Sequence, residues 1–464
     1  MEGPQRRPHL SKLPRRFRDR PPRVFAALAA GFGLLAILAL STSSDGRSSL
    51  GTAAFCHGAS SHRSSRSPSK RSSCRARALR RLSPRRAARA DGVYPEPRDG
   101  VNWADLGFGL TTKDTIVAVA TCSRGGEWGQ YSLEPYGPLQ LEPAATVLNY
   151  GQSIFEGMKA YRTRKGRIVL FRPQMNARRL AGGAERLMMP PVPEDFFLEL
   201  VSALVRANAD WVPPAGSGAL YLRPLLFGSG AGLGVGPSSE YTLVVYAAPV
   251  GEYFKSAGGG GAHMRLESDH QRAATRGVGD VKYAGNYAPC FLPQSQARAD
   301  GFSDIIYLDE SGRWIEEAAA SNFFCVGQDG VLRSPGLGTI LPGVTRDSVL
   351  QLARRLVDEG DVGPGSLRGV EAGRVSAQDA LGSVEAFVTG TGAGLTPVRR
   401  LVCGHREARF ECPGPATQRL RDALTGLQLE DQEDALGWLW DPFTDGVDAK
   451  PLPEEEQQLE RTAA

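Results

Sequence analysis

Cysteine and histidine are scarce in this chain of 464 residues, and this scarcity limits the chemistry to be expected. There are seven cysteines, which is an odd number, and no two of them form a Cys-x-x-Cys pair. We interpret the six histidines as ordinary surface or core residues. Structural zinc sites and disulfide frameworks both depend on clustered or evenly paired ligands. We therefore expect no metal and favour a reducing compartment.

Acidic residues are nearly absent from the first 90 positions. That segment holds 20 Lys and Arg against 3 Asp and Glu, whereas the rest of the chain holds 35 against 47. The net charge of +5 thus comes from the start of the chain, which argues against a nucleic-acid-binding protein. Because the run SSHRSSRSPSKRSSCRARALRRLSPRR cannot form a packed core, we expect residues 1–92 to be a disordered targeting leader.

Long apolar runs are also missing, with one borderline case in the leader. Residues 24–40 are apolar or glycine, which is short of the roughly 20 residues of a membrane span and longer than the about 7 to 15 of a signal peptide. The basic, hydroxyl-rich segment that follows makes the leader resemble the bipartite presequence of algae with complex plastids, with a first cleavage before Phe55. We predict a plastid location and no stable membrane association after leader removal. A mitochondrial or simple plastid transit peptide, a retained anchor and the secretory route stay open.

What the chain does contain is a lysine in a glycine-rich loop. In GVGDVKYAGNYA, residues 277–288, Lys282 precedes Tyr287 by five positions, and Glu317 follows 35 positions after the lysine. An enzyme that uses pyridoxal phosphate needs a lysine for a covalent link and an acidic partner for the pyridine nitrogen. Lys282 and Glu317 fit these two roles.

A phosphate group needs backbone N–H donors and a cation, which a helix N-terminus and an arginine supply together. LPGVTRD, residues 341–347, predicts such a helix start, with Gly343 turning the backbone, Val344 and Thr345 at the phosphate and Thr345 as N-cap. Arg179 in MNARRL is the candidate cation. The sequence therefore predicts a pyridoxal phosphate site.

Eight segments in order resemble the branched-chain-amino-acid aminotransferases, the L-specific branch of the fold-type-IV pyridoxal phosphate enzymes, in their eukaryotic, plant-like form. The resemblance spans residues 102–428 and is carried by VNWADLGFGL, VLNYGQSIFEGMKAYR, LFRPQMNARRL, LYLRPLLFGSGAGLGVGPSSEYTLVVYAAPVGEYF, KYAGNYA, LPGVTRD, GTGAGLTPV and GPATQRLRDAL. It implies an α/β (α+β) chain with a smaller α/β N-terminal domain at 95–248, an interdomain loop at 249–261 and a larger pseudo-barrel C-terminal domain at 262–430. Residues 431–464 depart from the family as a variable tail without an assigned role.

The resemblance also implies a role for each site residue, and transamination between L-leucine, L-isoleucine or L-valine and 2-oxoglutarate. Lys282 is the catalytic base, and the phosphate, the O3′ hydroxyl and the ring nitrogen of the cofactor are held by Arg179, Val344, Thr345, Thr391, Tyr287 and Glu317. The substrate contacts are Tyr150, Phe155, Tyr221, Arg223, Tyr253, the Gly392 backbone and, from the second subunit of a homodimer, Val235. Arg223 is expected on the same strand face as Tyr221, where it would bind the side-chain carboxylate of glutamate; a structural ion pair is the alternative.

Several alternatives remain at this point. Within the fold these are a D-amino-acid aminotransferase and an aminodeoxychorismate lyase; outside it, a cofactor-binding protein without turnover and a membrane-tethered scaffold. The chain departs from the family at Ala284, where glycine is usual, and at Ala320, where glycine or threonine is usual. It also lacks the Cys-x-x-Cys of the animal enzymes, because Ala393 and Thr396 stand at those positions. We expect these changes to leave the roles intact.

Local patterns predict several elements. Strands are expected at 168–171, 241–248, 303–309 and 322–327, and helices at 194–212 and 345–360, the first with apolar positions 197, 200, 201, 204 and 205 on its core face. GAGLGVG, residues 230–236, is similar to a dinucleotide-binding loop, but a second strand is expected after it in place of a helix. We therefore do not predict dinucleotide binding.

Overall fold

The computed structural model describes residues 94–251, 260–360 and 362–445. The leader, the apolar run at 24–40 and Tyr253 lie outside these residues. Within them, no helix has both the length and the apolar character that crossing a membrane requires.

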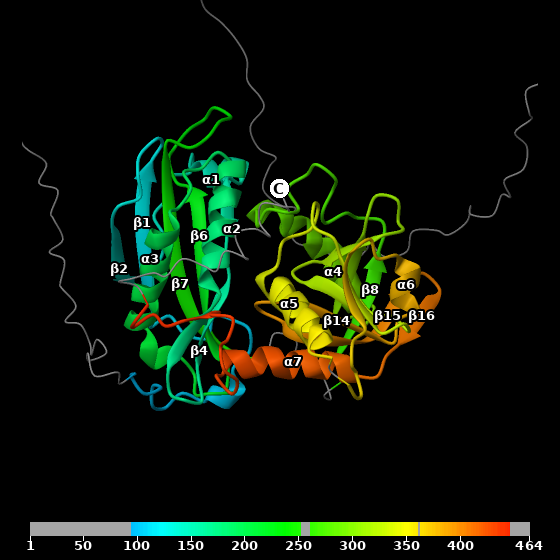
Figure 1. Cartoon of the computed structure of the whole chain (residues 1–464). Coiled ribbons are helices and arrows are strands. Elements are labelled where there is room, and N and C mark those ends of the chain that lie inside the picture. Colours follow the sequence, from blue (N-terminus) through cyan, green and yellow to red (C-terminus); the bar gives the residue numbers. More distant parts are fainter. Residues whose placement is uncertain (1–93, 252–259, 361, 446–464) are drawn as a thin grey trace, which may run out of the picture. The chain divides into compact units, whose positions relative to one another are not determined.

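Most of the strands in the first part of the chain, with β17 from its end, form an antiparallel sheet of eight strands in which β3 pairs with β6. Figure 1 shows β1, β2, β4, β6 and β7 of this sheet. Its strand order is β17-β5-β4-β6-β7-β1-β2. The strands are β1 (Ile116–Ser123), β2 (Tyr131–Pro135), β3 (Ser153–Phe155), β4 (Met158–Arg162), β5 (Ile168–Phe171), β6 (Ala219–Gly228), β7 (Glu240–Val250) and β17 (Leu439–Trp440). The helices of this part are α1 (Thr146–Tyr150), α2 (Pro173–Arg186), α3 (Glu194–Ala207) and the short 3-10 helices Trp103–Asp105 and Ala209–Trp211.

Helix α3 confirms the amphipathic pattern. Its predicted core positions are fully buried against the sheet: Phe197, Leu200, Val201, Leu204 and Val205. The strands predicted at 168–171 and 241–248 are β5 and β7, and β7 follows the glycine-rich loop as expected. The strands β1 to β7 lie almost entirely within residues 95–248, the range predicted for the N-terminal domain, and β17 is added to them from residues 439–440.

The second part of the chain contains a closed barrel of six strands, in the order β10-β9-β8-β15-β14-β11, because β10 also pairs with β11. Strands β12, β13 and β16 extend it at the edges. The strands are β8 (Ala262–Glu267), β9 (Asp304–Leu308), β10 (Ile315–Ala318), β11 (Asn322–Val326), β12 (Val331–Pro335), β13 (Gly369–Gly373), β14 (Glu385–Gly390), β15 (Gly394–Cys403) and β16 (Arg406–Arg409). The helices are α4 (Phe291–Ala299), α5 (Val344–Asp358), α6 (Ala377–Leu381), α7 (Pro415–Gln428) and the 3-10 helices Ala284–Asn286 and Ala288–Cys290. The pseudo-barrel and the α/β fold class are thus confirmed.

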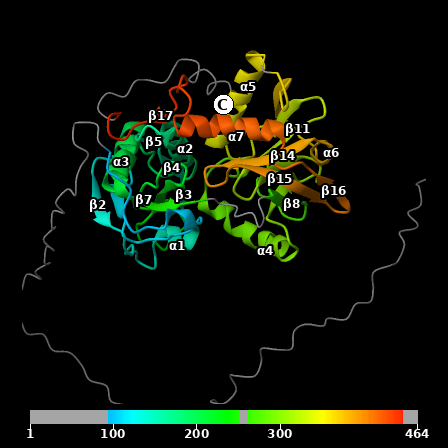
Figure 2. The ribbon, with the colours of Figure 1, turned by 90° about the horizontal axis from the view of Figure 1, so that it is seen from below.

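Strand β11 shows how the barrel is covered. All of its residues are buried, since Phe324 and Val326 pack with α5 and α7 while Phe323 and Cys325 pack in a second core. Phe324 stacks on Phe387 of β14 with ring centroids 4.9 Å apart. A strand covered on both faces has a continuous apolar run, which explains the sequence NFFCV. Figure 2 shows α5 and α7 beside β14 and β11.

The start of α5 corrects one prediction. Gly343, and not Thr345, is the N-cap, and Thr345 is the second residue of the helix. No side chain caps this end, so the first N–H groups of the helix keep their capacity to bind another acceptor. Gly343 has φ −73, but a Cβ there would lie 2.1 Å from Asn322 Oδ1, so the glycine is needed for a close approach rather than for an unusual turn. The predicted helix end is confirmed by Gly360 with φ +68.

The start of the tail packs on the first sheet. Strand β17 pairs with β5 (Figure 2). The Trp440 indole donates to Ser202 Oγ at 3.1 Å. Asp441 is buried, and it accepts hydrogen bonds from Tyr94 and from Arg167. Residues 438–445 therefore complete the edge of a sheet that was formed mostly by residues 116–250, a role that the sequence did not indicate.

Candidate functional site

Lys282 lies in the loop between β8 and α4, and neighbouring residues fix its position. Asn286 stabilises this loop by donating to the carbonyls of Val278 at 2.7 Å and Val281 at 3.0 Å. The Lys282 carbonyl accepts from the N–H of Phe155 at 3.2 Å, which joins the loop to β3 of the first sheet. The lysine therefore lies where the sheet and the barrel meet.

The Lys282 amine faces two aromatic rings. Nζ donates to the Tyr287 hydroxyl at 3.2 Å and lies 4.7 Å from the centre of the Phe155 ring. The Phe155 and Tyr287 rings meet edge to face at 4.8 Å. The structure thus brings the predicted catalytic lysine, the predicted O3′ ligand and one predicted pocket residue into direct contact.

Glu317 on β10 is a buried carboxylate with several donors. It accepts from Asn322 Nδ2 at 3.2 Å and from the Leu341 N–H at 3.2 Å, and Arg272 Nη2 lies 3.6 Å from Oε1. Burial raises the pKa of Glu317 to about 7, although Arg272, the Leu341 N–H and Lys282 act in the opposite direction. A protonated ring nitrogen beside Glu317 would be a cation, and a nearby cation favours the ionised form of a carboxyl group. Glu317 is therefore well suited to hold such a nitrogen.

Arg179 on α2 is held by Glu156, a residue that the sequence reasoning did not single out. Glu156 is fully buried, and Arg179 donates to both of its oxygens at 2.7 Å. Burial alone would raise the pKa of Glu156, but the Arg179 guanidinium outweighs it and keeps the pKa below its usual value. Arg179 also donates to the Pro342 carbonyl at 2.7 Å, two residues before α5. Its guanidinium therefore lies next to the uncapped N-terminus of α5.

The remaining phosphate candidates gather at the same end. Val344 and Thr345 are the first two residues of α5, and Thr391 is at the tip of the hairpin between β14 and β15. Val344, Thr345 and Thr391 line one small cavity, together with Asn176 and Lys159. A helix N-terminus, an arginine and a threonine in this arrangement have the donors that a phosphate group requires.

Two of the residues predicted to bind the substrate, Tyr221 and Arg223, lie together on β6. They are two residues apart, and Arg223 donates to the Tyr221 hydroxyl at 3.2 Å while its guanidinium lies 4.8 Å from the Phe155 ring centre. This confirms that the two side chains share a face, and among the described residues Arg223 has no acidic partner. Its Nε is buried without a hydrogen bond.

Tyr150 and Val235 lie at the outer edge of the site. Tyr150, at the end of α1, is 39% exposed, and its hydroxyl donates to the Leu233 carbonyl at 2.6 Å. Val235 is 89% exposed in the loop between β6 and β7, and Leu233 in the same loop is 92% exposed. The role predicted for Val235 in the pocket of a second subunit therefore stays a prediction.

Arg272 is a further site residue that no spacing rule indicated, although it precedes Lys282 by only ten positions. It is buried, its guanidinium lies 5.1 Å from the Tyr287 ring centre, and it approaches Glu317. Its Nη1 has no hydrogen-bond partner in the described structure. Arg272 therefore adds a positive charge between Glu317 and Tyr287, the two residues predicted to bind the cofactor ring.

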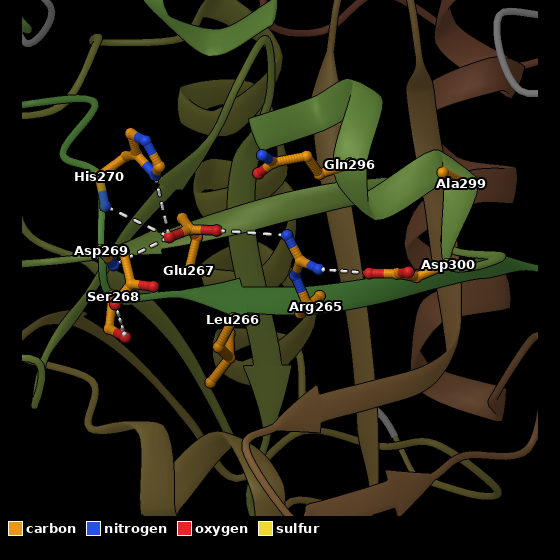
Figure 3. A pocket seen from close by; sticks show the side chains of 9 residues that line it. All are labelled: Arg265, Leu266, Glu267, Ser268, Asp269, His270, Gln296, Ala299 and Asp300. Atoms are coloured by element: carbon orange, nitrogen blue, oxygen red, sulfur yellow. Dashed lines mark hydrogen bonds and ion pairs between the residues drawn. The ribbon is translucent and has the colours of Figure 1, made fainter. Parts of the chain in front are cut away.

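A wide surface hollow lies elsewhere, on the outside of the barrel (Figure 3). It is lined by Arg265, Leu266, Glu267, Ser268, Asp269, His270, Gln296, Ala299 and Asp300. Its charged groups satisfy one another, since Arg265 bridges Glu267 and Asp300, and Glu267 accepts from the N–H groups of Asp269 and His270. None of the predicted site residues lines it, so the site is the Lys282 region.

Comparison with known proteins agrees with this geometry. The family described as Amino-transferase class IV matches residues 153–401. Branched-chain-amino-acid aminotransferase 2, chloroplastic, from Arabidopsis thaliana is 42% identical, covering 76% of this chain and 87% of that protein. Branched-chain-amino-acid aminotransferase 1, mitochondrial, from the same plant is 41% identical, covering 76% and 88%.

Solved structures of aminotransferases are similar to this chain in fold. The branched-chain amino acid aminotransferase of Escherichia coli has a TM-score of 0.58 at 28% identity, covering 71% of this chain and 100% of that one. The T.th. enzyme with pyridoxamine 5'-phosphate has a TM-score of 0.57 at 26% identity, covering 72% and 100%. The sequence match, the shared fold and the contacts around Lys282 together assign this chain to the branched-chain-amino-acid aminotransferases, within the class IV aminotransferases.

Proposed function

We propose that this enzyme uses pyridoxal 5'-phosphate to transaminate L-leucine, L-isoleucine or L-valine with 2-oxoglutarate, which yields branched-chain 2-oxo acids and L-glutamate. The observation that carries the proposal is the contact of Lys282 Nζ with the Tyr287 hydroxyl at 3.2 Å, beside the buried Glu317. The T.th. structures support it, because they contain pyridoxamine 5'-phosphate and N-(5'-phosphopyridoxyl)-L-glutamate.

The residues present fit this cofactor. Glu317 would hold the ring nitrogen and Tyr287 the O3′ hydroxyl, while the N–H groups of Val344 and Thr345 would bind the phosphate. Arg179, which Glu156 holds in place, would provide a cation for the phosphate, and the Thr391 hydroxyl would add a further donor. Bound here, the cofactor supplies an electron-withdrawing ring that acidifies the substrate Cα–H.

The chain then has to move one proton. We assign this step to Lys282, whose amine would take the proton from the substrate Cα and return it to C4′ of the cofactor. Tyr287 and Phe155 restrict the amine to one side of the site. In this proposal, Lys282 serves as the base for both proton transfers, so no second general base is invoked.

The substrate contacts come from the sheet and from the barrel hairpin. The α-carboxylate would bind the Gly392 backbone and the Tyr221 hydroxyl, and Arg223 would serve the second carboxylate of glutamate. The apolar side chain would meet Phe155, Tyr150 and Tyr253. Val235 would complete this pocket from the partner in a homodimer, which agrees with its exposure of 89% in the single chain.

An absorbance experiment tests the proposal. The protein without residues 1–92 should bind pyridoxal phosphate and turn yellow, and Lys282→Ala should remove the yellow band and lower turnover by roughly 10⁴-fold. L-Leucine and L-glutamate should bleach the band, whereas D-alanine should not. A wild-type protein that cannot be reconstituted with pyridoxal phosphate would contradict the proposal, and bleaching by D-alanine alone would favour a D-amino-acid aminotransferase.

We also propose that the leader directs the enzyme to a plastid. Relatives named chloroplastic and mitochondrial support an organelle, and the basic, acid-poor composition of residues 1–90 fits a targeting segment. Residues 1–92 fused to a fluorescent protein should label plastids, and their deletion should leave activity unchanged. Labelling of mitochondria would favour the alternative, and uniform cytosolic fluorescence would refute both.

A further inference from the structure

Lys159 on β4 is a lysine near the site that has no role in the chemistry proposed so far. Its Nζ donates to the carbonyl of Gly392 at 3.2 Å, and no acidic side chain in the described parts of the chain pairs with it. Burial lowers the pKa of Lys159 to about 8. The side chain is half-buried, and withdrawing an ammonium group from water is costly, so its contact with a single carbonyl needs an explanation.

Gly392 is in the middle of the turn that joins β14 to β15. Gly390 pairs with Gly394, so residues 391–393 form a three-residue connection at the tip of this hairpin. A glycine in such a turn has wide conformational freedom. Because the peptide group is planar, fixing the Gly392 carbonyl also fixes the N–H of Ala393 and limits the orientation of Gly392 as a whole. Lys159 thus restrains the most adaptable part of the turn.

Lys159 also lies beside Tyr221. The two residues are direct partners in the antiparallel pairing of β4 with β6, so their side chains leave the sheet on the same face. Tyr221 and the Gly392 backbone are the two groups proposed to receive the substrate α-carboxylate, one from the sheet and one from the barrel. Lys159 connects these two elements, since its backbone is in the sheet and its amine binds the hairpin.

We propose that Lys159 is a positioning residue for the α-carboxylate: it holds the tip of the β14–β15 hairpin at a fixed place relative to Tyr221. This inference rests on the proposed function. It makes a distinctive prediction, because the α-carboxylate is common to every amino-acid substrate. Loss of Lys159 should weaken leucine and glutamate equally, whereas loss of Arg223 should affect glutamate alone.

The test is Lys159→Met, which keeps the length of the side chain but removes the donor. In the holoenzyme, the KM for leucine and for glutamate should each rise about tenfold or more, as expected for a lost charge-assisted hydrogen bond. A second readout does not depend on turnover: the affinity for 4-methylpentanoate, a carboxylate with the leucine skeleton, should fall by the same factor when it is derived from thermal stabilisation at several ligand concentrations. Binding of 3-methylbutylamine, which lacks the carboxylate, should not change.

Two variants complete the experiment. Lys165→Met changes an exposed lysine in the turn after the same strand and should behave as wild type, and Lys159→Arg should recover part of the carboxylate affinity. Unchanged affinity for 4-methylpentanoate in Lys159→Met would overturn the inference, as would equal weakening of 3-methylbutylamine or loss of the yellow cofactor band. Failure of the wild-type protein to bind pyridoxal phosphate would instead contradict the proposed function.

Discussion

The cofactor end and the substrate end of the site differ in how completely this chain builds them. At the cofactor end, Glu156 is fully buried and Glu317 is 2% exposed, and each accepts hydrogen bonds from at least two groups of the same chain. At the substrate end, Tyr150 is 39% and Val235 is 89% exposed, and Arg223 retains an unused buried donor.

This contrast follows from what each end has to bind. In the proposed function, one cofactor would stay bound through all turnovers, so its ligands would benefit from being fixed in advance by paired, buried charges. Two substrates of different polarity would alternate at the other end, which would therefore need an unpaired cation and an apolar wall together. Variants at each end, each with a matched control, can test whether the two ends differ in this way.

The largest effect on stability is expected from the cofactor end. Glu156→Gln leaves the buried Arg179 guanidinium without its carboxylate, which should lower the free energy of unfolding by about 3 to 5 kcal/mol and weaken binding of pyridoxal phosphate. Urea titration and spectrophotometric titration measure the two effects. Asp329→Asn, which breaks the surface pair with Arg333, is the control and should change little. Equal losses of stability in both variants would contradict the greater importance of the buried Glu156–Arg179 pair.

A pH dependence should identify Glu317. Its folded-state pKa of about 7 lies above the ordinary value, so the folded protein binds this proton more tightly than the unfolded chain does. The stability that this proton contributes is complete below about pH 4.5 and is lost as the pH rises through 7, on the order of 3 kcal/mol. In protein stripped of pyridoxal phosphate, the urea midpoint should therefore fall over this range, and less so in Glu317→Gln. Burial also raises the pKa of Glu316 to about 7, and Glu317 contributes to this rise, so the difference between the two proteins reports Glu317 together with its effect on Glu316.

At the substrate end, Arg223→Met should separate the two substrates. The variant removes a charge-assisted hydrogen bond to the glutamate side chain worth about 1.5 to 3 kcal/mol, or roughly 10- to 150-fold in the glutamate half-reaction. The leucine half-reaction should be largely spared. Single-turnover bleaching of the yellow form by each amino acid measures both rates. Equal losses would mean that Arg223 supports the fold or the Tyr221 hydroxyl instead.

A smaller effect is expected from Val235, because only the pocket of a partner subunit would sense it. Val235→Ala removes apolar surface that should be buried on assembly, and we expect about a tenfold lower kcat/KM for leucine without a change in the urea midpoint. Val362→Ala, an equally conservative change at another exposed valine, is the matched control. If Val235→Ala has no effect in a protein shown to be dimeric, the pocket does not include this loop.

The smallest effect is expected from oxidation. Cys122, Cys290 and Cys325 are buried, and burial also raises the pKa of Cys412, so thiolates are disfavoured at neutral pH. Mild peroxide after removal of reductant should therefore leave most activity intact at both ends of the site. A reversible, thiol-dependent loss of most activity would show that a reactive cysteine had been overlooked.

The sequence alone determined the parts that depend on local pattern. Helical periodicity was enough for α3, and β-branched and aromatic content was enough for β5. The glycine-flanked Lys282 with Tyr287 and Glu317 predicted a cofactor class that agrees with the cofactor-bound forms of related structures. Each of these signals lies within a short stretch or a known order of motifs. The N-cap of α5 was predicted wrongly, at Thr345 instead of Gly343, because threonine is a common cap and only the close approach of Asn322 makes a glycine necessary.

Only the tertiary structure decided which distant residues meet. Arg179 was foreseen as a cation, but its buried partner Glu156 lies 23 positions away in the connection between β3 and β4, and Lys159 contacts Gly392 across 233 positions. Pairing of β17 with β5 joins residues that are still further apart in the chain. Such contacts depend on how distant strands, helices and turns pack together, and no local propensity or spacing along the chain encodes that arrangement.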